Sequence, residues 1–475
     1  MRLMNQALVL ELRRQLEGTR AEISHLGSET YHADIKSWSE TCEKDAGAIV
    51  KVTSAEEVSK TILFARRHNI EFVAKAGGHS TSSESATRGG IVISLERMRD
   101  VVVDPASKTV RVQGGCRWED VNQATTAYGL AVVGATASQT GVSASALGGG
   151  FGWLTGQYGL ISDNLVMATM VLADGSVLEA SEDRHNDLFW AIRGAGQAFG
   201  IATELVFKAH SIPDKVFGGS LNFEADKLAT IVAFANRFHQ QQDEHSGFFF
   251  GFRRPSPEED CMIMTLLFYN GPMEKATAFF EPVLALQCAL GKADMMSYTE
   301  VNRLANVEPT PKGRKWIGGT EISFPLEEKL AHELWLEFDR LIHLSPTMDN
   351  SVLAFELLPY GQVTSVPVEA TACANRGHSY NAGLLLCWQN PDDDAVVTQK
   401  GRALLRNIRR WQPLSYIDGD DHVRAYANYA GHNYSPKYVF GVNLPRLQEL
   451  KRRYDPHNAF HKWHNLVSPS EDIPR

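Results

Sequence analysis

Hydrophobic residues recur along the first half of the chain at two spacings, one helical and one typical of strands. Residues 54–68 begin with Ser54 and Glu57, which form a capping box, and apolar residues follow at helical spacing, so we predict a helix there. Runs rich in Val, Ile and Leu predict strands at 71–75, 101–103, 109–112, 165–172, 177–180 and 201–208, and helices are predicted at 118–128 and 188–192. Asp174 and Gly175 predict a hairpin turn, because this pair accepts positive φ.

The pattern changes after about Pro213. Segments at 220–223, 247–252, 262–268 and 384–388 are apolar or alternating and have strand length, and longer helical segments occupy 226–242 and 326–342. This mixture is typical of an antiparallel sheet covered by helices. A last helix is predicted at 447–453. We therefore expect a two-part α/β (α+β) fold.

Length and charge limit the class of protein. A chain of 475 residues exceeds what one hydrophobic core usually holds, which indicates two or three domains. The formal net charge of -9 argues against a general nucleic-acid binder, which needs clustered excess Lys and Arg. No nucleic-acid partner is expected.

The N-terminus and the cysteines bear on the compartment. Glu11, Arg13 and Arg14 interrupt the apolar residues of segment 1–18, which predicts an amphipathic helix and not a secretory signal. No run approaches the roughly 20 apolar residues of a membrane span, so no membrane partner is expected. The six cysteines are scattered without a C-x-x-C pair, which favours thiols in a reducing compartment. We expect a cytoplasmic protein, with secretion of a longer precursor left open.

A small-residue loop separates two apolar runs within 72–95 that we predict to be strands. Residues 76–80 read AGGHS, and the two glycines allow positive φ and close approach of backbone N–H groups to an anion. The loop also presents the imidazole of His79. On its own such a pentapeptide is equally compatible with an ordinary turn and a surface histidine.

Two other patterns resemble known sites but lack required parts. The glycines of 194–200 follow a predicted helix and precede a predicted strand, the reverse of the order in a Rossmann dinucleotide site. His457, His461 and His464 have a spacing that could align on one helix, but no carboxylate or cysteine accompanies them. No metal site is predicted.

Several segments together resemble the FAD-linked oxidases of the vanillyl-alcohol-oxidase/p-cresol-methylhydroxylase superfamily, in the berberine-bridge-enzyme-like branch. The similar segments, in the family's order, are AGGHS at 76–80, GGIVISL at 89–95, VRVQGG at 110–115, GV at 141–142, LGGGFG at 147–152, DLFWAIRG at 187–194, FGIAT at 199–203, YANY at 426–429 and YDPHNAF at 454–460. They span most of the chain.

The resemblance implies FAD as cofactor, bonded covalently through the ring of His79. The family's second tether, a cysteine, falls on Ala137, which cannot form a thioether, and Cys116 lies outside that loop, so a singly linked flavin is expected. Thr140 is expected near the flavin face where oxygen approaches. The full set of expected cofactor-binding residues is Lys75, Ala76, Gly77, Gly78, His79, Ser80, Thr136, Ala137, Thr140, Gly141, Val142, Ala144, Leu147, Gly148, Gly149, Gly152, Asn164, Gly200, Ile201, Tyr426, Asn428 and Asn443.

Two residues are catalytic candidates. By resemblance Tyr429 faces the substrate and removes a hydroxyl proton, which near pH 7 requires a lowered phenol pKa or a proton relay. Some relatives carry a glutamate on a strand after an arginine, but segment 375–382 here contains no carboxylate. Glu356 is the second candidate, because a carboxylate on an otherwise apolar strand is unusual unless it is paired. An ion-paired or strand-end glutamate is the competing interpretation.

The implied reaction is transfer of a hydride from an alcohol, amine or activated C–H of a small organic molecule, such as a secondary metabolite, to flavin N5, with O2 as acceptor. The alternatives are a non-redox isomerase or cyclase that uses the flavin as a scaffold, and a flavoprotein that only carries a ligand. The expected domains are a helical segment at 1–32, an FAD-binding domain at 33–213, a substrate-binding domain at 214–420 and a C-terminal segment at 421–475 that returns to the FAD domain.

Overall fold

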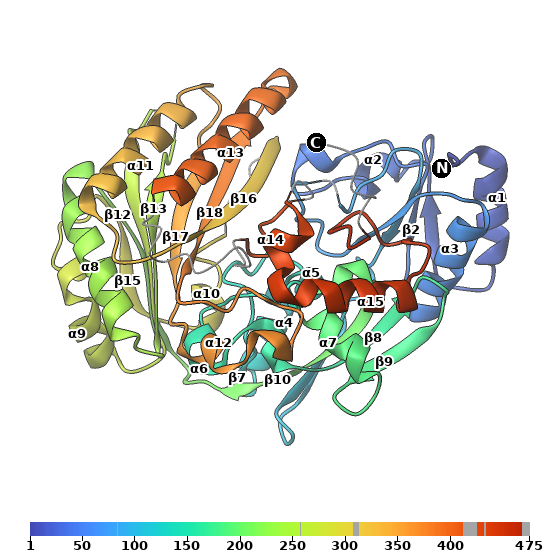
Figure 1. The fold of residues 1–475 in the computed structure, drawn as a ribbon, viewed down its shortest axis with the longest axis horizontal. Helices are drawn as coiled ribbons and strands as arrows, with labels where there is room; N and C mark the ends of the chain where they lie inside the picture. The colour runs from blue at the N-terminus through green and yellow to red at the C-terminus, as the bar shows by residue number, and fades with distance from the viewer. Residues whose placement is uncertain (83, 257, 307–312, 412–424, 432–433, 468–475) are drawn as a thin grey trace.

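The computed structural model describes residues 1–475 except 83, 257, 307–312, 412–424, 432–433 and 468–475. The N-terminal and C-terminal elements lie together on one side of the molecule, and the middle of the chain forms a large sheet on the other side (Figure 1). The expected domain boundary between 420 and 421 falls outside the described residues.

The first sheet has the strand order β1-β2-β4-β3, and β4 pairs in parallel with both β2 and β3. The parallel pairing needs a crossover, which the predicted helix supplies as α3, and the Ser54 hydroxyl caps it by accepting a hydrogen bond from the Glu57 N–H. Helix α1 packs against this unit. The bounds are α1 Gln6–Gln15, β1 Glu22–Ser24, α2 Tyr31–Asp34, β2 Ala48–Lys51, α3 Ala55–Arg67, β3 Phe72–Lys75 and β4 Ile91–Ser94.

The second sheet is antiparallel, with the order β5-β6-β10-β8-β9. The predicted hairpin joins β8 to β9, and Gly175 has φ +81° in its turn. Segment 194–200 runs from the end of helix α7 to the start of strand β10, so the element order excludes a Rossmann strand–loop–helix site. The bounds are β5 Val101–Asp104, β6 Thr109–Gln113, α4 Trp118–Thr126, β7 Leu130–Ala131, α5 Val142–Leu147, α6 Thr155–Tyr158, β8 Leu165–Leu172, β9 Val177–Ser181, α7 Asn186–Ala195, β10 Gly200–Lys208 and β11 His210–Ser211.

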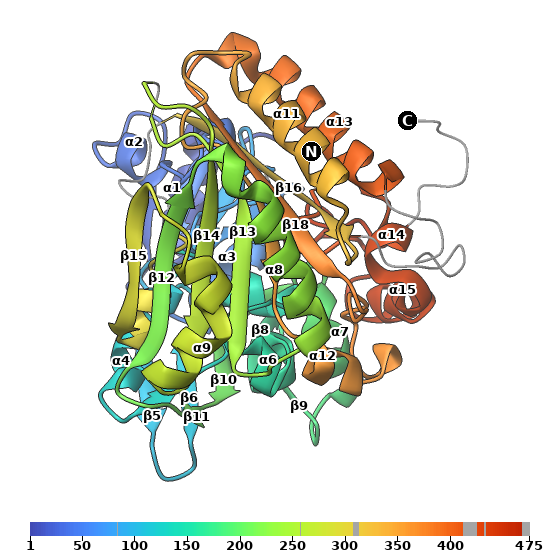
Figure 2. The same ribbon diagram turned by 90° about the vertical axis from the view of Figure 1, so that its left-hand side faces the viewer.

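The third sheet confirms the expected antiparallel architecture. Its seven strands have the order β15-β12-β14-β13-β17-β18-β16, and helices α8, α9, α11 and α13 cover its outer face (Figures 1 and 2). The bounds are β12 Val216–Phe223, α8 Leu228–Gln241, β13 Ser246–Arg253, β14 Met262–Tyr269, α9 Met273–Leu284, β15 Leu290–Met296, α10 Tyr298–Val301, β16 Arg314–Ile322, α11 Glu328–Ile342, β17 Val352–Leu357, α12 Gly361–Ser365, β18 Tyr380–Trp388 and α13 Asp394–Trp411.

Strand β13 shows how the third sheet has two chemically different faces. Phe248, Phe250 and Phe252 point into the core under the helices, and the Phe234 ring of α8 lies 4.8 Å from that of Phe248. Because side chains alternate along a strand, Phe249 and Arg253 point to the opposite face. That face looks toward the rest of the molecule.

The C-terminal segment returns to the first two sheets through α14 Pro436–Phe440 and α15 Leu444–Tyr454. Lys451 and Asp455 form a fully buried ion pair at 2.7 Å, and the Lys451 ammonium also donates to the carbonyl oxygens of Ala198 and Phe460. The cost of burying this pair is offset by these bonds, which fix the end of α15. Since α15 ends at Tyr454, the three C-terminal histidines do not share one helix.

In the described part of the chain, every helix is too short or too polar to cross a bilayer.

Candidate active site

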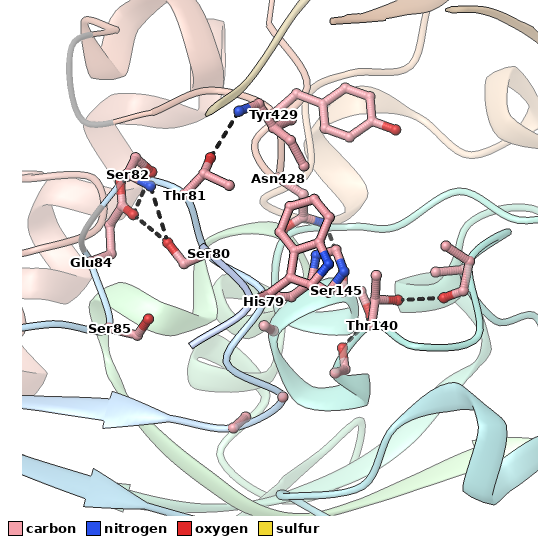
Figure 3. A pocket seen from close by; sticks show the side chains of 18 of the residues that line it. His79, Ser80, Thr81, Ser82, Glu84, Ser85, Thr140, Ser145, Asn428 and Tyr429 are labelled. Carbon is pink, nitrogen blue, oxygen red and sulfur yellow. Dashed lines mark hydrogen bonds between the residues drawn. The ribbon is translucent and has the colours of Figure 1, made fainter. Parts of the chain in front are cut away.

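A cavity of about 530 Å³ lies between the first two sheets, the inner face of the third sheet and the C-terminal segment. Its volume is in the range of sites that bury a small organic ligand. Segments distant in the sequence meet around it, and Figure 3 labels His79, Thr140 and Asn428 among the residues that line it. The edge strand β16 closes one side, because the Ile317 N–H donates to the Thr81 hydroxyl at 2.9 Å, next to the His79 loop.

The His79 loop follows β3 and lies directly against a second glycine loop. Gly78 has φ +66°, and a Cβ added to Gly77 would lie 2.8 Å from the backbone of Gly141. Only glycine permits this approach, so the two loops pack backbone to backbone. The resulting wall of small residues leaves backbone groups open to a ligand.

The His79 ring has an unusual environment. It stacks on Trp38 with the ring centroids 3.8 Å apart, and its buried Nε2 has no hydrogen-bond partner. Burial lowers the pKa of His79 to about 3, and the positive charges of Arg117 and Lys315 add to the effect. The imidazole is therefore neutral at pH 7 and keeps an unprotonated nitrogen, the form required of a nucleophile.

The adjacent part of the wall is segment 134–145, which contains Gly141. The Thr140 hydroxyl donates to the Ala137 carbonyl at 2.8 Å, and Trp118 N–H donates to the Thr140 carbonyl at 3.1 Å. These bonds fix a loop whose cavity side carries short side chains, apart from that of Gln139. Cys116 is buried outside the cavity lining, and burial raises the pKa of its thiol to about 12.

Glu356 and Tyr429 meet in this cavity. Strand β17 carries Glu356, and the Tyr429 hydroxyl donates to its Oε1 at 2.5 Å. The Tyr429 ring lies over Gly319 and Gly383, where an added Cβ would be 2.7 Å and 3.3 Å from the ring. The third sheet thus makes room for the phenol through two adjacent glycines.

The pair behaves as one acid–base unit. Burial raises the pKa of Glu356 to about 7, against the opposing effect of hydrogen bonds from Tyr429 and Asn381. Burial, followed by the negative charge of Glu356, holds the pKa of Tyr429 well above its usual range. A lowered phenol pKa, one of the two conditions under which Tyr429 could act as base, is therefore excluded. The relay is the remaining condition, with the carboxylate as the group that titrates near neutrality.

A second, much smaller cavity of about 10 Å³ lies against Glu356. This is about the volume that one water molecule requires. Polar groups dominate its wall, including the side chains of Tyr360, Asn375, Ser379 and Asn381. Glu356 therefore lines both the main cavity and a small polar cavity.

Tyr426 and Asn428 connect the C-terminal segment to the glycine loops. The Asn428 amide donates to the Ser145 carbonyl at 2.9 Å and to the Tyr426 hydroxyl at 2.8 Å. A Cβ at Gly148 would lie 2.0 Å from the Asn428 Oδ1, so that glycine makes space for the amide. Tyr429 is positioned through these contacts.

The structure brings most of the predicted site residues to the cavity wall. They come from five segments, and those that line it are Ala76, Gly77, Gly78, His79, Ser80, Thr136, Ala137, Thr140, Gly141, Ala144, Leu147, Gly200, Ile201, Glu356, Tyr426, Asn428 and Tyr429.

Seven predicted residues are not among those that line the cavity, because other groups engage them. The Lys75 ammonium donates to the Asp34 carbonyl at 3.1 Å, the Asn164 amide to the Leu160 carbonyl at 2.8 Å, and the Asn443 amide to the Val368 carbonyl at 2.9 Å. Val142 is fully buried in the core. The space beside Gly148, Gly149 and Gly152 is taken by Asn428, by Cys373 and by the Gly134 carbonyl.

Sequence reasoning missed several residues that line the cavity. Trp38, Phe249, Arg253, Met264 and Lys462 all do so. Trp38 lies in an irregular segment without periodicity. The other residues lie on segments of the third sheet and the C-terminus, and only the packing of these segments shows which side faces the cavity. Alternation along the predicted strand 247–252 is the one signal that could have separated Phe249 from its neighbours.

Comparison with known proteins agrees with this geometry. A family model described as FAD binding domain matches residues 46–181, and one described as berberine and berberine like matches residues 425–466. The chain is 34% identical to the FAD-linked oxidoreductase pgmH of Aspergillus terreus, over 97% of this chain and 96% of that protein. It is 27% identical to (R)-6-hydroxynicotine oxidase of Paenarthrobacter nicotinovorans, over 88% and 90%.

Solved structures share the fold. The BBE-like 1 protein of Physcomitrella patens superposes with a TM-score of 0.83 at 21% identity, covering 96% of this chain and 99% of that one. Xylooligosaccharide oxidase of Myceliophthora thermophila, in complex with xylobiose, gives 0.79 at 21% identity, with 97% and 99% covered. Fold and site thus define an FAD-dependent oxidoreductase. The chain belongs to the berberine-bridge-enzyme-like branch of the vanillyl-alcohol-oxidase/p-cresol-methylhydroxylase family.

Proposed function

We propose that this protein is an oxidase that removes a hydride from a carbon bearing a hydroxyl or amine, or from an activated C–H, of a small, mainly apolar natural product. The observation that carries the proposal is the Tyr429–Glu356 hydrogen bond of 2.5 Å in the same cavity as the His79 loop. Bound FAD supplies a hydride acceptor that O2 reoxidises with release of peroxide.

The chain's own residues handle the proton. A substrate hydroxyl at Tyr429 gives its proton to the phenol oxygen while the phenol proton passes to Oε1 of Glu356. The relay needs no phenolate, which agrees with the raised pKa of Tyr429. The protonated carboxyl then releases the proton through the small polar cavity on its other side. The third sheet covers the site and limits access of bulk water.

His79 is proposed to hold the cofactor covalently. Its neutral ring, its unpartnered Nε2 and the close packing of the Gly77 and Gly141 loops fit a flavin edge at this position. Ala137 lines the cavity where the family's second tether would lie, and it offers no thiol. We therefore propose one covalent link. A peptide map of the holoenzyme is expected to show flavin on the His79 peptide and on no cysteine peptide.

Anaerobic mixing with phenolics, alkaloids, oligosaccharides and polyketides, followed by admission of air, tests the proposed function. An oxidase substrate bleaches the flavin and then yields about one peroxide per turnover. Product formation without bleaching would instead establish the non-redox isomerase or cyclase. Binding without any chemical change would establish a carrier.

A further inference from the structure

Arg253 is an arginine of the cavity wall, and Glu259 attracts its charge only from beyond ion-pair distance. Its Nε is buried and has no hydrogen-bond partner. Among the described residues, Lys462 is the other cation of the wall, and it pairs with Glu71 at 2.9 Å. No ion pair of Arg253 occurs in the same part of the chain. The residue as a whole is only partly buried, but a partly desolvated cation without an ion-pair partner is still costly, so its retention points to a ligand that completes it.

The strand register fixes where Arg253 lies relative to the proposed acid–base pair. On β13 Phe249 pairs with Glu356, and Arg253, four residues further along, pairs with Val352. At about 3.3 Å per residue, the backbone positions of Arg253 and Glu356 are separated by about 13 Å along the sheet. The cation and the Tyr429–Glu356 pair are therefore at different ends of the same wall.

Small apolar residues form much of the wall between these ends. Gly251 pairs with Ala354, and Ala354 with Gly383, so three adjacent strands carry small residues at this level. Val352 and Met264 also line the cavity here. An extended apolar body fits such a surface, whereas a sugar chain would find few hydrogen-bond partners on it.

We propose that Arg253 binds a carboxylate at one end of an extended apolar substrate whose other end is oxidised beside Tyr429 and Glu356. The inference rests on the proposed function for the identity of the reacting end. A guanidinium binds a carboxylate through two parallel hydrogen bonds, which fixes orientation as well as position. The anchor would thus select acids and align the reacting carbon.

Two rigid probes test the anchor in the holoenzyme. One is a biphenyl with a carboxylate at one end and a hydroxymethyl group at the other, and the second is its primary carboxamide. Binding is followed by the change in flavin absorbance, and reduction is followed separately under anaerobic conditions. The wild type is expected to bind the acid about tenfold to a hundredfold more tightly than the amide.

The variants assign this preference to one residue. Arg253→Met, which keeps an unbranched apolar side chain, should lose the preference for the acid and leave amide binding unchanged. Arg253→Lys should restore part of it. Arg254→Met is the matched control, because Arg254 does not line the cavity and its Nε donates to the Glu259 carbonyl at 3.1 Å. That variant should retain the wild-type preference.

The outcomes separate the anchor from the oxidase function. Equal affinity of the wild type for acid and amide, no binding of the acid at millimolar concentration, or a preference that survives in Arg253→Met would overturn the anchor. Tight Arg253-dependent binding without flavin reduction would support the anchor and count against the proposed reaction. Reduction of the flavin by both probes, bound with equal affinity, would count against the anchor and support the proposed reaction.

Discussion

Replacing Glu356 by glutamine tests the acid–base assignment most directly. Glutamine keeps the shape of the side chain but cannot accept a proton. With a pKa of about 7, Glu356 in the wild type is about one-tenth ionised at pH 6 and about nine-tenths ionised at pH 8. Flavin reduction by an alcohol substrate should therefore rise about tenfold between these pH values and level off above them.

The assay is anaerobic stopped-flow reduction at saturating substrate across this pH range. In Glu356→Gln we expect the limiting rate to fall by about 10²–10⁴-fold, the range for loss of a general base, and the rise between pH 6 and 8 to disappear. Glu321→Gln is the control. Glu321 lies on β16 of the same sheet, accepts a hydrogen bond from Ser379, and is not among the residues that line the cavity. A Glu356→Gln enzyme with the wild-type rate and the wild-type pH midpoint would refute the reasoning.

The same pKa predicts a stability effect with a definite sign. The folded pKa of Glu356 lies above its ordinary value of 4.5, so the folded state binds more protons than the unfolded state between about pH 4.5 and 7. The free energy of unfolding therefore decreases as pH rises through this window, by about 3 kcal/mol in total from this group. Glu356→Gln should be more stable than the wild type above pH 7, and the difference should vanish near pH 4.5. Chemical denaturation at both pH values measures it.

Three further predictions concern other residues. Tyr429→Phe removes the relay and a hydrogen bond that lowers the pKa of Glu356. Flavin reduction should therefore slow far more than substrate affinity changes, and the pH midpoint of the rate should move above 7. An unchanged rate and midpoint would remove Tyr429 from the mechanism. His79→Ala should leave the denatured, precipitated protein colourless while the wild type stays yellow; a yellow variant precipitate would exclude this tether. Arg376→Met should cost about 3–5 kcal/mol in denaturant unfolding, because it leaves Asp163 buried and unpaired, whereas the exposed control Arg184→Met should cost less than about 1 kcal/mol.

Local patterns accounted for much of the fold. The helix at 54–68, the hairpin at Asp174 and Gly175 and the third-sheet strands β12, β13, β14 and β18 follow from capping, turn chemistry and hydrophobic period, which act between residues close in the chain. The order of the first two sheets did not follow from these patterns. It depends on pairings such as β10 with β6, in which Glu204 pairs with Gln113, 91 residues earlier in the chain.

The part of the site that is expected to bind the cofactor could also be predicted from the sequence. The glycine loops, His79 and the alanine at 137 are properties of short segments, and the resemblance to a flavoprotein family rests on those segments. Lys75, Asn164 and Asn443 were predicted to contact the cofactor, but none lines the cavity, because their polar groups bond to nearby backbone. A sequence motif does not show which of its side chains has a partner elsewhere.

The sequence by itself predicted the loops of a flavin-binding site, a candidate catalytic tyrosine and a sheet that covers them. Only the tertiary structure decided which group titrates: Glu356 and Tyr429 are 73 residues apart, and their contact and shared burial set both pKa values. The same is true of Arg253, which cannot be told from other arginines in the sequence but lies in the structure on an apolar cavity wall, with no ion pair among the described residues. Desolvation and pairing depend on three-dimensional neighbours, and for this reason the chemistry of the site follows from the fold.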